Sequence, residues 1–227
     1  MGGRLFCGGI GKVNLLDKIT DGVTDDNVYK RIGWMVVSFF LLFVPGTALS
    51  FYLLPKGILR GKHPIISALE FSSDLWTCTL QIFGYNLIPT FLIIGANLLA
   101  QQSRLSRKKY VPIGYTAFWG LTVLFAVVLG TWSFEVIAAA PPLFRRFVRF
   151  FDVFHHAGLL EFSAYLLAAA TSFKFTLWYS NRKKIVASRA WRDTNLTGPE
   201  RVFLMLAFVL LFCAAFVESC GIIHLTG

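Results

Sequence analysis

Five long apolar segments constrain this chain more than any other feature of its sequence. They cover residues 32–55, 75–101, 113–140, 156–180 and 200–223. Each is long enough to cross the roughly 30 Å hydrocarbon core of a bilayer as a helix. Helices are expected because lipid offers no partner to unpaired backbone groups. The sequence therefore predicts an all-α fold, a polytopic transmembrane bundle with five spanning helices.

The composition agrees with a membrane location. Hydrophobic residues make up 56% of the chain and charged residues only 15%, which is too apolar for an ordinary soluble domain of this length. We therefore expect no separate soluble domain. Residues 1–31 are interpreted as a cytoplasmic N-terminal segment, and residues 32–227 as a single transmembrane helical domain in the plasma or inner membrane.

The basic residues predict the orientation. The formal net charge is +10, and the Lys and Arg side chains lie mainly in residues 1–31, 102–112 and 181–198. The alternate connections are poorer in them. This bias predicts a cytoplasmic N-terminus and an external C-terminus. Since the charges sit in short connections between apolar spans, we expect them to meet anionic lipid rather than nucleic acid.

The two outer connections are expected to lie at the membrane surface. Residues 58–74 mix apolar and charged positions, and in residues 143–154 phenylalanines at helical spacing alternate with arginines. This pattern is typical of an amphipathic segment in the interface. A re-entrant helix is the alternative for the second segment.

Acidic residues gather near the outer ends of the predicted spans. Glu135, Glu161 and Glu218 lie at similar depth in three different spans. Intramembrane acids are costly and usually face the bundle or a wet cavity. Small residues that share a face with Glu161 and Glu218 would let these helices approach closely. We therefore predict a helix-packing polar cluster, whose members are Asn86, Glu135, Gly158, Glu161, Ala164 and Glu218.

A catalytic or metal site is the weaker interpretation of the same region. His155 and His156 precede Glu161 by six and five residues, whereas a site on one helix prefers a spacing of three or four. The three side chains converge only if the helix begins near Gly158. The sequence also has no nucleophile with a credible base and no Gly-rich phosphate loop. We expect no catalytic residue, no cofactor and a non-enzymatic role.

Three short stretches resemble the stage II sporulation protein M family. They are Gly158-Leu-Leu-Glu161-Phe-Ser-Ala164, Phe83-Gly-Tyr-Asn86-Leu and Phe216-Val-Glu218, all within residues 80–223. Ala157 stands where many members have a histidine, and Phe162 replaces a common leucine. The resemblance therefore extends to Asn86, Gly158, Glu161 and Glu218, and to five spans with the N-terminus inside, but not to His156.

The resemblance implies a role in assembling a membrane complex. The family's named member takes part in cell-wall remodelling during spore engulfment, where it helps to assemble a wall hydrolase. Our first hypothesis is a membrane scaffold or assembly subunit that binds other membrane or envelope proteins, or further copies of itself. A permease-like subunit of a transporter, with a polar site near the outer face, is the second, and an intramembrane metal site or enzyme is the third.

Overall fold

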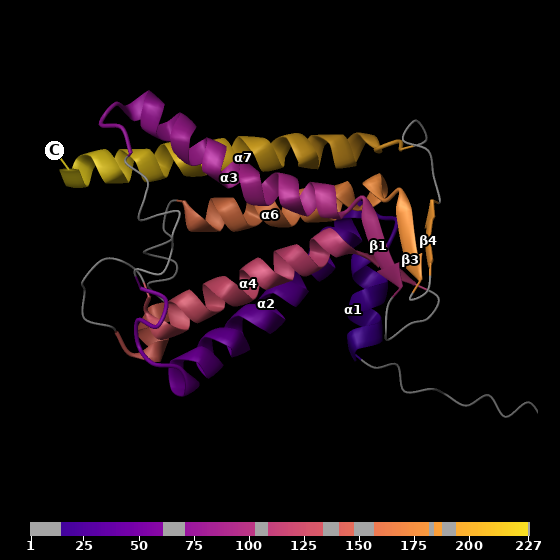
Figure 1. Ribbon diagram of the computed structural model, residues 1–227, viewed down its shortest axis with the longest axis horizontal. Coiled ribbons are helices and arrows are strands. Elements are labelled where there is room, and N and C mark those ends of the chain that lie inside the picture. Colours follow the sequence, from indigo (N-terminus) through magenta and orange to yellow (C-terminus); the bar gives the residue numbers. More distant parts are fainter. Residues whose placement is uncertain are drawn as a thin grey trace, which may run out of the picture.

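The structure is a computed structural model that describes residues 15–60, 71–102, 109–133, 141–147, 157–181, 184–187 and 194–226. Most of these residues are helical, and a small sheet closes one end of the bundle (Figure 1). In chain order the elements are α1 (Leu15–Val23), α2 (Val28–Leu53), α3 (Leu75–Ala96), β1 (Leu99–Gln102), β2 (Tyr110–Pro112), α4 (Ile113–Thr131), α6 (Gly158–Thr171), the 3-10 turn η2 (Ser172–Phe175), β3 (Trp178–Asn181), β4 (Lys184–Ala187) and α7 (Gly198–Thr226).

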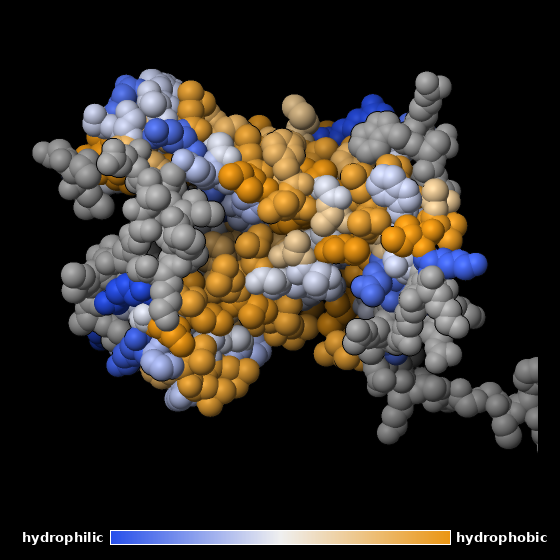
Figure 2. All heavy atoms as spheres, in the orientation of Figure 1, coloured by the Kyte–Doolittle hydropathy of each residue, from blue (hydrophilic) through white to orange (hydrophobic). Residues whose placement is uncertain are grey.

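Four helices are long and apolar enough to cross a membrane, namely α2, α3, α4 and α7. Figure 2 shows the corresponding surface: apolar residues cover the middle of the visible face, and polar residues gather towards its two ends. This distribution is the one expected of a protein whose middle is covered by lipid. Four helices of this length and apolarity therefore agree with the prediction of a membrane protein.

The predicted fifth span is not confirmed. Within residues 156–180 the helix α6 has 14 residues, so it is about 21 Å long and shorter than the hydrocarbon core. It ends at Thr171, and the chain continues through η2 into β3. Most of α6 is buried by protein because α2, α3, α4 and α7 all pack against it.

The expectation of an all-α fold was wrong for the connections 102–112 and 181–198. Four short strands form one sheet in the order β2-β1-β3-β4, with β1 parallel to β3 and both outer pairs antiparallel. Each hairpin belongs to one of the two basic connections predicted to lie inside. Residues with high β-propensity, such as Val111, Tyr179 and Val186, stand at paired positions. The sheet thus joins two connections that are far apart in the sequence.

The third predicted span also ends earlier than expected. We predicted a helix over 113–140, but α4 ends at Thr131, and Trp132 adopts a left-handed conformation with φ of 54°. A residue in this conformation terminates a helix because it turns the chain out of the helical path. Residues 134–140 lie outside the described part of the chain.

Close helix contacts depend on small residues. A Cβ atom added at Gly130 of α4 would lie 2.6 Å from the carbonyl oxygen of Thr47 in α2, and one at Gly114 would lie 2.1 Å from the carbonyl oxygen of Ile93 in α3. On α6, Ala168, Ala169 and Ala170 are fully buried. Small side chains let helix backbones approach where lipid provides no hydrophobic driving force for association.

Aromatic rings connect α6 to the pair formed by α2 and α4. The ring of Phe162 lies 4.6 Å from that of Phe125 and 5.4 Å from that of Phe39, measured between centroids. These rings belong to the main buried cluster of the protein. Edge-on and tilted contacts of this kind add to the packing energy of the rings. The helix α6 is therefore the element on which the other helices converge.

Candidate functional site

A polar cluster links α3 to α6 in the half of the bundle far from the sheet. The side-chain amide of Asn86 in α3 donates a hydrogen bond to Oε1 of Glu161 in α6. One helical turn later, the hydroxyl of Tyr165 lies 3.4 Å from Oδ1 of Asn86 and donates to it. The amide thus bridges a carboxyl group and a phenol on the neighbouring helix.

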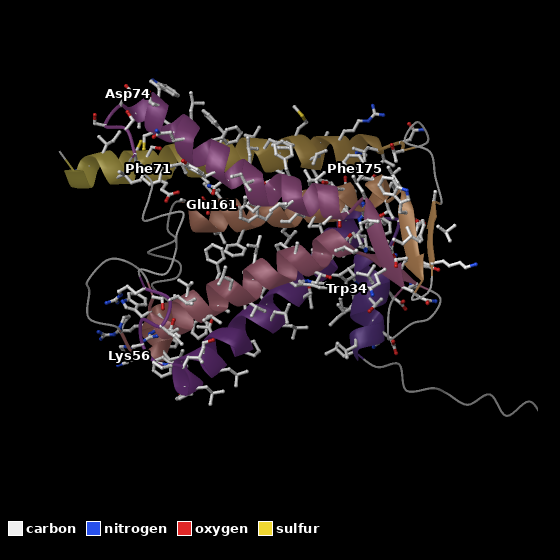
Figure 3. The ribbon with its side chains drawn as sticks, viewed as in Figure 1. Trp34, Lys56, Phe71, Asp74, Glu161 and Phe175 are labelled. Carbon is white, nitrogen blue, oxygen red and sulfur yellow. The ribbon has the colours of Figure 1, made fainter. Side chains whose placement is uncertain are left out.

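Glu161 stands at the N-terminal end of α6. It lies in the first turn of α6, where unpaired backbone N–H groups and the helix dipole favour a negative charge. Figure 3 shows Glu161 at the start of α6, on the side of the bundle away from the sheet. Glu161 is half-buried, whereas Tyr165 is buried.

The other predicted members of the cluster are found on α6 and α7 or lie outside the described residues. Gly158 and Ala164 are buried on α6. Glu218 on α7 has an exposed side chain, but it lies close enough for its charge to act on Glu161 and Tyr165. Ala214 and Ala215, on the small-residue face of α7, are fully buried. Glu135, His155 and His156 lie outside the described residues. Among the residues that are described, no group of three His, Cys, Asp or Glu side chains is arranged to hold a metal ion.

A second, fully buried polar cluster lies at the sheet end of the bundle. Arg31 of α2 and Glu200 of α7 are both 0% exposed, and Nη2 of Arg31 lies 2.6 Å from Oε1 of Glu200. The Nε of Arg31 donates to the carbonyl oxygen of Ala170 at 2.8 Å, and its Nη1 donates to that of Asp25 at 2.9 Å. One guanidinium therefore connects α2, α6 and α7.

Both carboxylate oxygens of Glu200 also have bonding partners. Its Oε2 accepts hydrogen bonds from the backbone N–H and the hydroxyl of Thr197, both at 2.8 Å, and lies 3.2 Å from Nζ of Lys174. The ring of Phe173 lies 4.8 Å from the guanidinium carbon of Arg31. Buried ion pairs need such additional bonds, because desolvation otherwise exceeds the Coulomb attraction. We call Arg31, Lys174 and Glu200 the buried ion network.

The sequence reasoning missed this network. Arg31 entered the sequence analysis only as one of the basic residues in 1–31 that predict the orientation. The signal was available, because the predicted topology places Arg31, Lys174 and Glu200 at the same end of three spans. Opposite charges at equal depth in adjacent spans usually pair.

Asn97 makes a further link between α3 and α6. Its Nδ2 donates to the carbonyl oxygen of Ala169 at 3.0 Å and to the hydroxyl of Ser172 at 2.6 Å. The backbone carbonyl oxygen of Asn97 accepts a hydrogen bond from Thr176 Oγ1 at 2.9 Å. The residue is fully buried.

Arg146 occupies the opposite end of the bundle. It was expected on the polar face of a surface segment, but its side chain is 0% exposed. Its Nη1 donates to the carbonyl oxygens of Leu129 and Gly130, in the last turn of α4, and its guanidinium carbon lies 4.6 Å from the ring centre of Phe51. Burial lowers the pKa of the Arg146 guanidinium. The cation satisfies helix carbonyl groups that would otherwise lack partners.

Two cavities open at the sheet end. One, of about 190 Å³, lies between the sheet and the buried ion network and is lined by Asp26, Tyr110 and Lys174 among others. The other, of about 400 Å³, lies between α1, the sheet and α4. Neither is lined by Asn86 or Glu161.

Comparison of the chain with protein-family models, curated proteins and solved structures finds no match.

Proposed function

We propose that this protein is a non-enzymatic membrane subunit that assembles with other membrane or envelope proteins. One observation carries the proposal: buried or half-buried polar side chains in the described part of the bundle join helices to one another. Arg31 and Glu200 join α2 to α7, Asn97 joins α3 to α6, and Asn86 joins α3 to Glu161. Polar groups used in this way give a rigid core rather than a reaction centre.

The transporter alternative needs a continuous polar path through the bundle. The two cavities described above lie at the sheet end, and the Asn86–Glu161 pair lines neither of them. The metal or enzyme alternative rests on His155 and His156, and elemental analysis of the purified protein tests it: a stoichiometric transition metal would support it.

The proposed topology has five crossings, a cytoplasmic N-terminus and an external C-terminus. In Figure 1 the α6 helix begins at the end far from the sheet and leads back to the sheet, between α4 and α7 in the chain. Counting it as a short fifth crossing leaves both basic hairpins and the start of α2 at one end. That arrangement agrees with the positive-inside rule. Labelling of single cysteines introduced at Lys184 and Leu54, from either side of sealed vesicles, tests it.

The resemblance to the stage II sporulation protein M family remains part of the proposal. Two of the residues that carry it, Asn86 and Glu161, are hydrogen-bonded to each other. Phe162, which replaces a common leucine of that family, packs between Phe39 and Phe125. On this basis the expected partner is an enzyme or scaffold of the cell envelope.

Three substitutions on α6 separate a packing role from a chemical one. Glu161→Gln keeps the acceptor for Asn86 and is expected to retain the wild-type melting temperature in detergent. Glu161→Leu removes that acceptor, and Ala164→Leu adds volume at a buried position, which typically costs about 1–3 kcal/mol. Leu159→Ala, at an exposed position of the same helix, is the control. Equal destabilisation by all three substitutions would contradict the packing role.

Isolation of the protein from its own membranes tests the assembly role. After cross-linking and purification in mild detergent, we expect one membrane or envelope protein in fixed stoichiometry with the wild type and with Glu161→Gln. Recovery of a cytoplasmic ATPase would favour the transporter. A monodisperse single chain without any partner would refute the proposal.

A further inference from the structure

The smaller cavity, of about 190 Å³, lies where the sheet meets the bundle. Its walls come from the turn between α1 and α2, from β1, β2 and β3, and from η2 with the residues that follow it. Figure 1 shows the sheet lying across the end of the bundle at which α2 and α7 begin. Since a water molecule occupies about 30 Å³ in the liquid, the cavity has room for about six water-sized groups. A small solute therefore fits it.

One wall of the cavity carries an excess of positive charge. Arg31 and Lys174 share a single carboxylate, that of Glu200, so the buried ion network has two cations and one anion. Lys174 is 21% exposed and lines the cavity. Its ammonium group has three N–H donors, and within the described part of the chain it bonds to one acceptor, Oε2 of Glu200 at 3.2 Å. An anionic group in the cavity would balance the remaining charge.

The opposite charge stands at the rim of the same cavity. Asp26, in the turn between α1 and α2, is exposed and belongs to the cavity lining. Its carboxylate forms no ion pair with a described residue, whereas the neighbouring Asp25 pairs with Lys30. Asp26 would repel a simple anion, and Lys174 would repel a simple cation. A molecule that carries both charges meets an opposite charge at each end.

Aromatic side chains contribute to the same lining. They are Tyr110 of β2, Phe173 of η2 and Tyr179 of β3. The rings of Tyr110 and Tyr179 lie edge to face, with their centroids 4.8 Å apart, and neither hydroxyl has a hydrogen bond to another described residue. A phenol can donate to a carboxylate, and the face of an aromatic ring attracts an ammonium group. The rings therefore suit a ligand with both groups.

We propose that this cavity binds a small zwitterionic amino acid from the aqueous phase at the sheet end. The carboxylate of the ligand accepts a hydrogen bond from Lys174, and its ammonium group lies near Asp26 and the aromatic rings. The bound molecule connects η2 to β2, β3 and the α1–α2 turn, and so holds the sheet against the bundle. This site goes beyond the proposed assembly role and does not depend on it.

Saturation-transfer difference NMR of the full-length protein in detergent tests the site, with empty micelles as the reference. Three ligands of similar size separate the charges: γ-aminobutyrate has both, butyrate has only the negative charge, and butylammonium has only the positive charge. We expect saturable binding of γ-aminobutyrate and roughly ten- to a hundredfold weaker binding of the other two, the change that loss of one charge-assisted hydrogen bond produces. Glycine and β-alanine are titrated as shorter zwitterions.

Two variants assign the charges of the site. Asp26→Asn is expected to remove the preference for γ-aminobutyrate over butyrate, and Lys174→Met is expected to remove the preference over butylammonium. Asp17→Asn and Lys30→Met are the matched controls, because neither residue lines the cavity, and both should bind the ligands as the wild type does. Melting curves establish that each variant is folded.

Several results would overturn the proposal. Equal affinity for butyrate and γ-aminobutyrate would identify a simple anion site, and equal affinity for butylammonium a simple cation site. Absence of saturable binding for all three zwitterions, or a loss of binding in the control variants as large as in Asp26→Asn and Lys174→Met, would also contradict it. None of these results bears on the assembly role, which the isolation of partner proteins tests.

Discussion

Removing the negative charge of Glu200 is expected to destabilise the protein more than any other single charge change in the described bundle. Glu200→Gln keeps the size of the side chain and one carbonyl oxygen for the guanidinium. It leaves Arg31, which is 0% exposed, without a counter-ion. Lys174 also loses its partner in this variant, but it is 21% exposed. Because its long side chain can reach water, this loss is expected to lower the free energy of unfolding less than the loss at Arg31.

The magnitude follows from burial. Deleting one partner of a buried ion pair typically costs about 3–5 kcal/mol, because the remaining charge stays in a medium of low polarity. The other hydrogen bonds of Arg31, to Ala170 and Asp25, hold the guanidinium in place and prevent its escape to water. We therefore expect a loss in that range for Glu200→Gln. The double variant Arg31→Met with Glu200→Leu is expected to lose less than the sum of its single changes, because no fully buried charge stays uncompensated.

Equilibrium unfolding in mixed micelles, followed by far-ultraviolet circular dichroism, measures these free energies. Lys30→Met is the matched control, since Lys30 is the neighbour of Arg31 and its 3.8 Å ion pair with Asp25 is solvent-exposed. It is expected to cost less than about 1 kcal/mol. A loss for Glu200→Gln no larger than for Lys30→Met, or strict additivity in the double variant, would refute the reasoning.

Three further predictions concern a close contact, a buried amide and a helix cap. Gly130→Ala is expected to lower the free energy of unfolding by about 1–3 kcal/mol, because its Cβ atom would lie 2.6 Å from the Thr47 carbonyl oxygen. Gly120→Ala is the control: no neighbouring atom lies within 4 Å of its Cβ position, and the change should be neutral or slightly stabilising. Melting curves in detergent compare the two variants. Asn97→Leu removes the donor to Ala169 and Ser172 and should lower the free energy of unfolding by about 1–3 kcal/mol, while the exposed control Asn195→Leu should leave it unchanged. Hydrogen bonds from the backbone N–H and the hydroxyl of Thr77 hold the pKa of the Asp74 carboxyl below its ordinary value of 3.8. The wild type should therefore melt at a higher temperature than Asp74→Ala above that pH, and the difference should disappear as the pH falls through the lowered pKa; a difference that grows on acidification would contradict this assignment.

The four long helices could be predicted from the sequence because length and apolarity suffice to identify them. The predicted segment 200–223 falls within α7, and 75–101 contains all of α3. The sheet could not be predicted in the same way. Its strands have three or four residues, and Trp178 and Tyr179 continue an apolar run that also fits a helix. Periodicity does not separate the two over so few residues.

For the polar contacts, the sequence identified some of the residues but not which of them bond to each other. The helical periodicity predicted that Glu161 shares a face with small residues, and the family resemblance added Asn86 to the cluster. Neither predicted that these two side chains would bond to each other. The Arg31–Glu200 pair joins residues 169 positions apart. Such a pair depends on which helices are neighbours, and one sequence does not specify the neighbours of a span. The sequence placed Arg31 and Glu200 at the same end of their predicted spans, and the structure adds that these two helices are neighbours.

The distribution of these bonds bears on whether the bundle can move as a transporter does. Alternating access requires one group of helices to rock against another around a site near the membrane centre. Here α2 and α4 form one close pair, and α3, α6 and α7 pack together beside it. At the sheet end, Arg31 ties α2 to α6 and α7, and Gly114 brings α4 against the backbone of α3. Rocking would have to break a fully buried ion pair, whose loss costs several kcal/mol. A fixed sheet end is compatible with a scaffold, and it limits any motion to the end that carries Glu161.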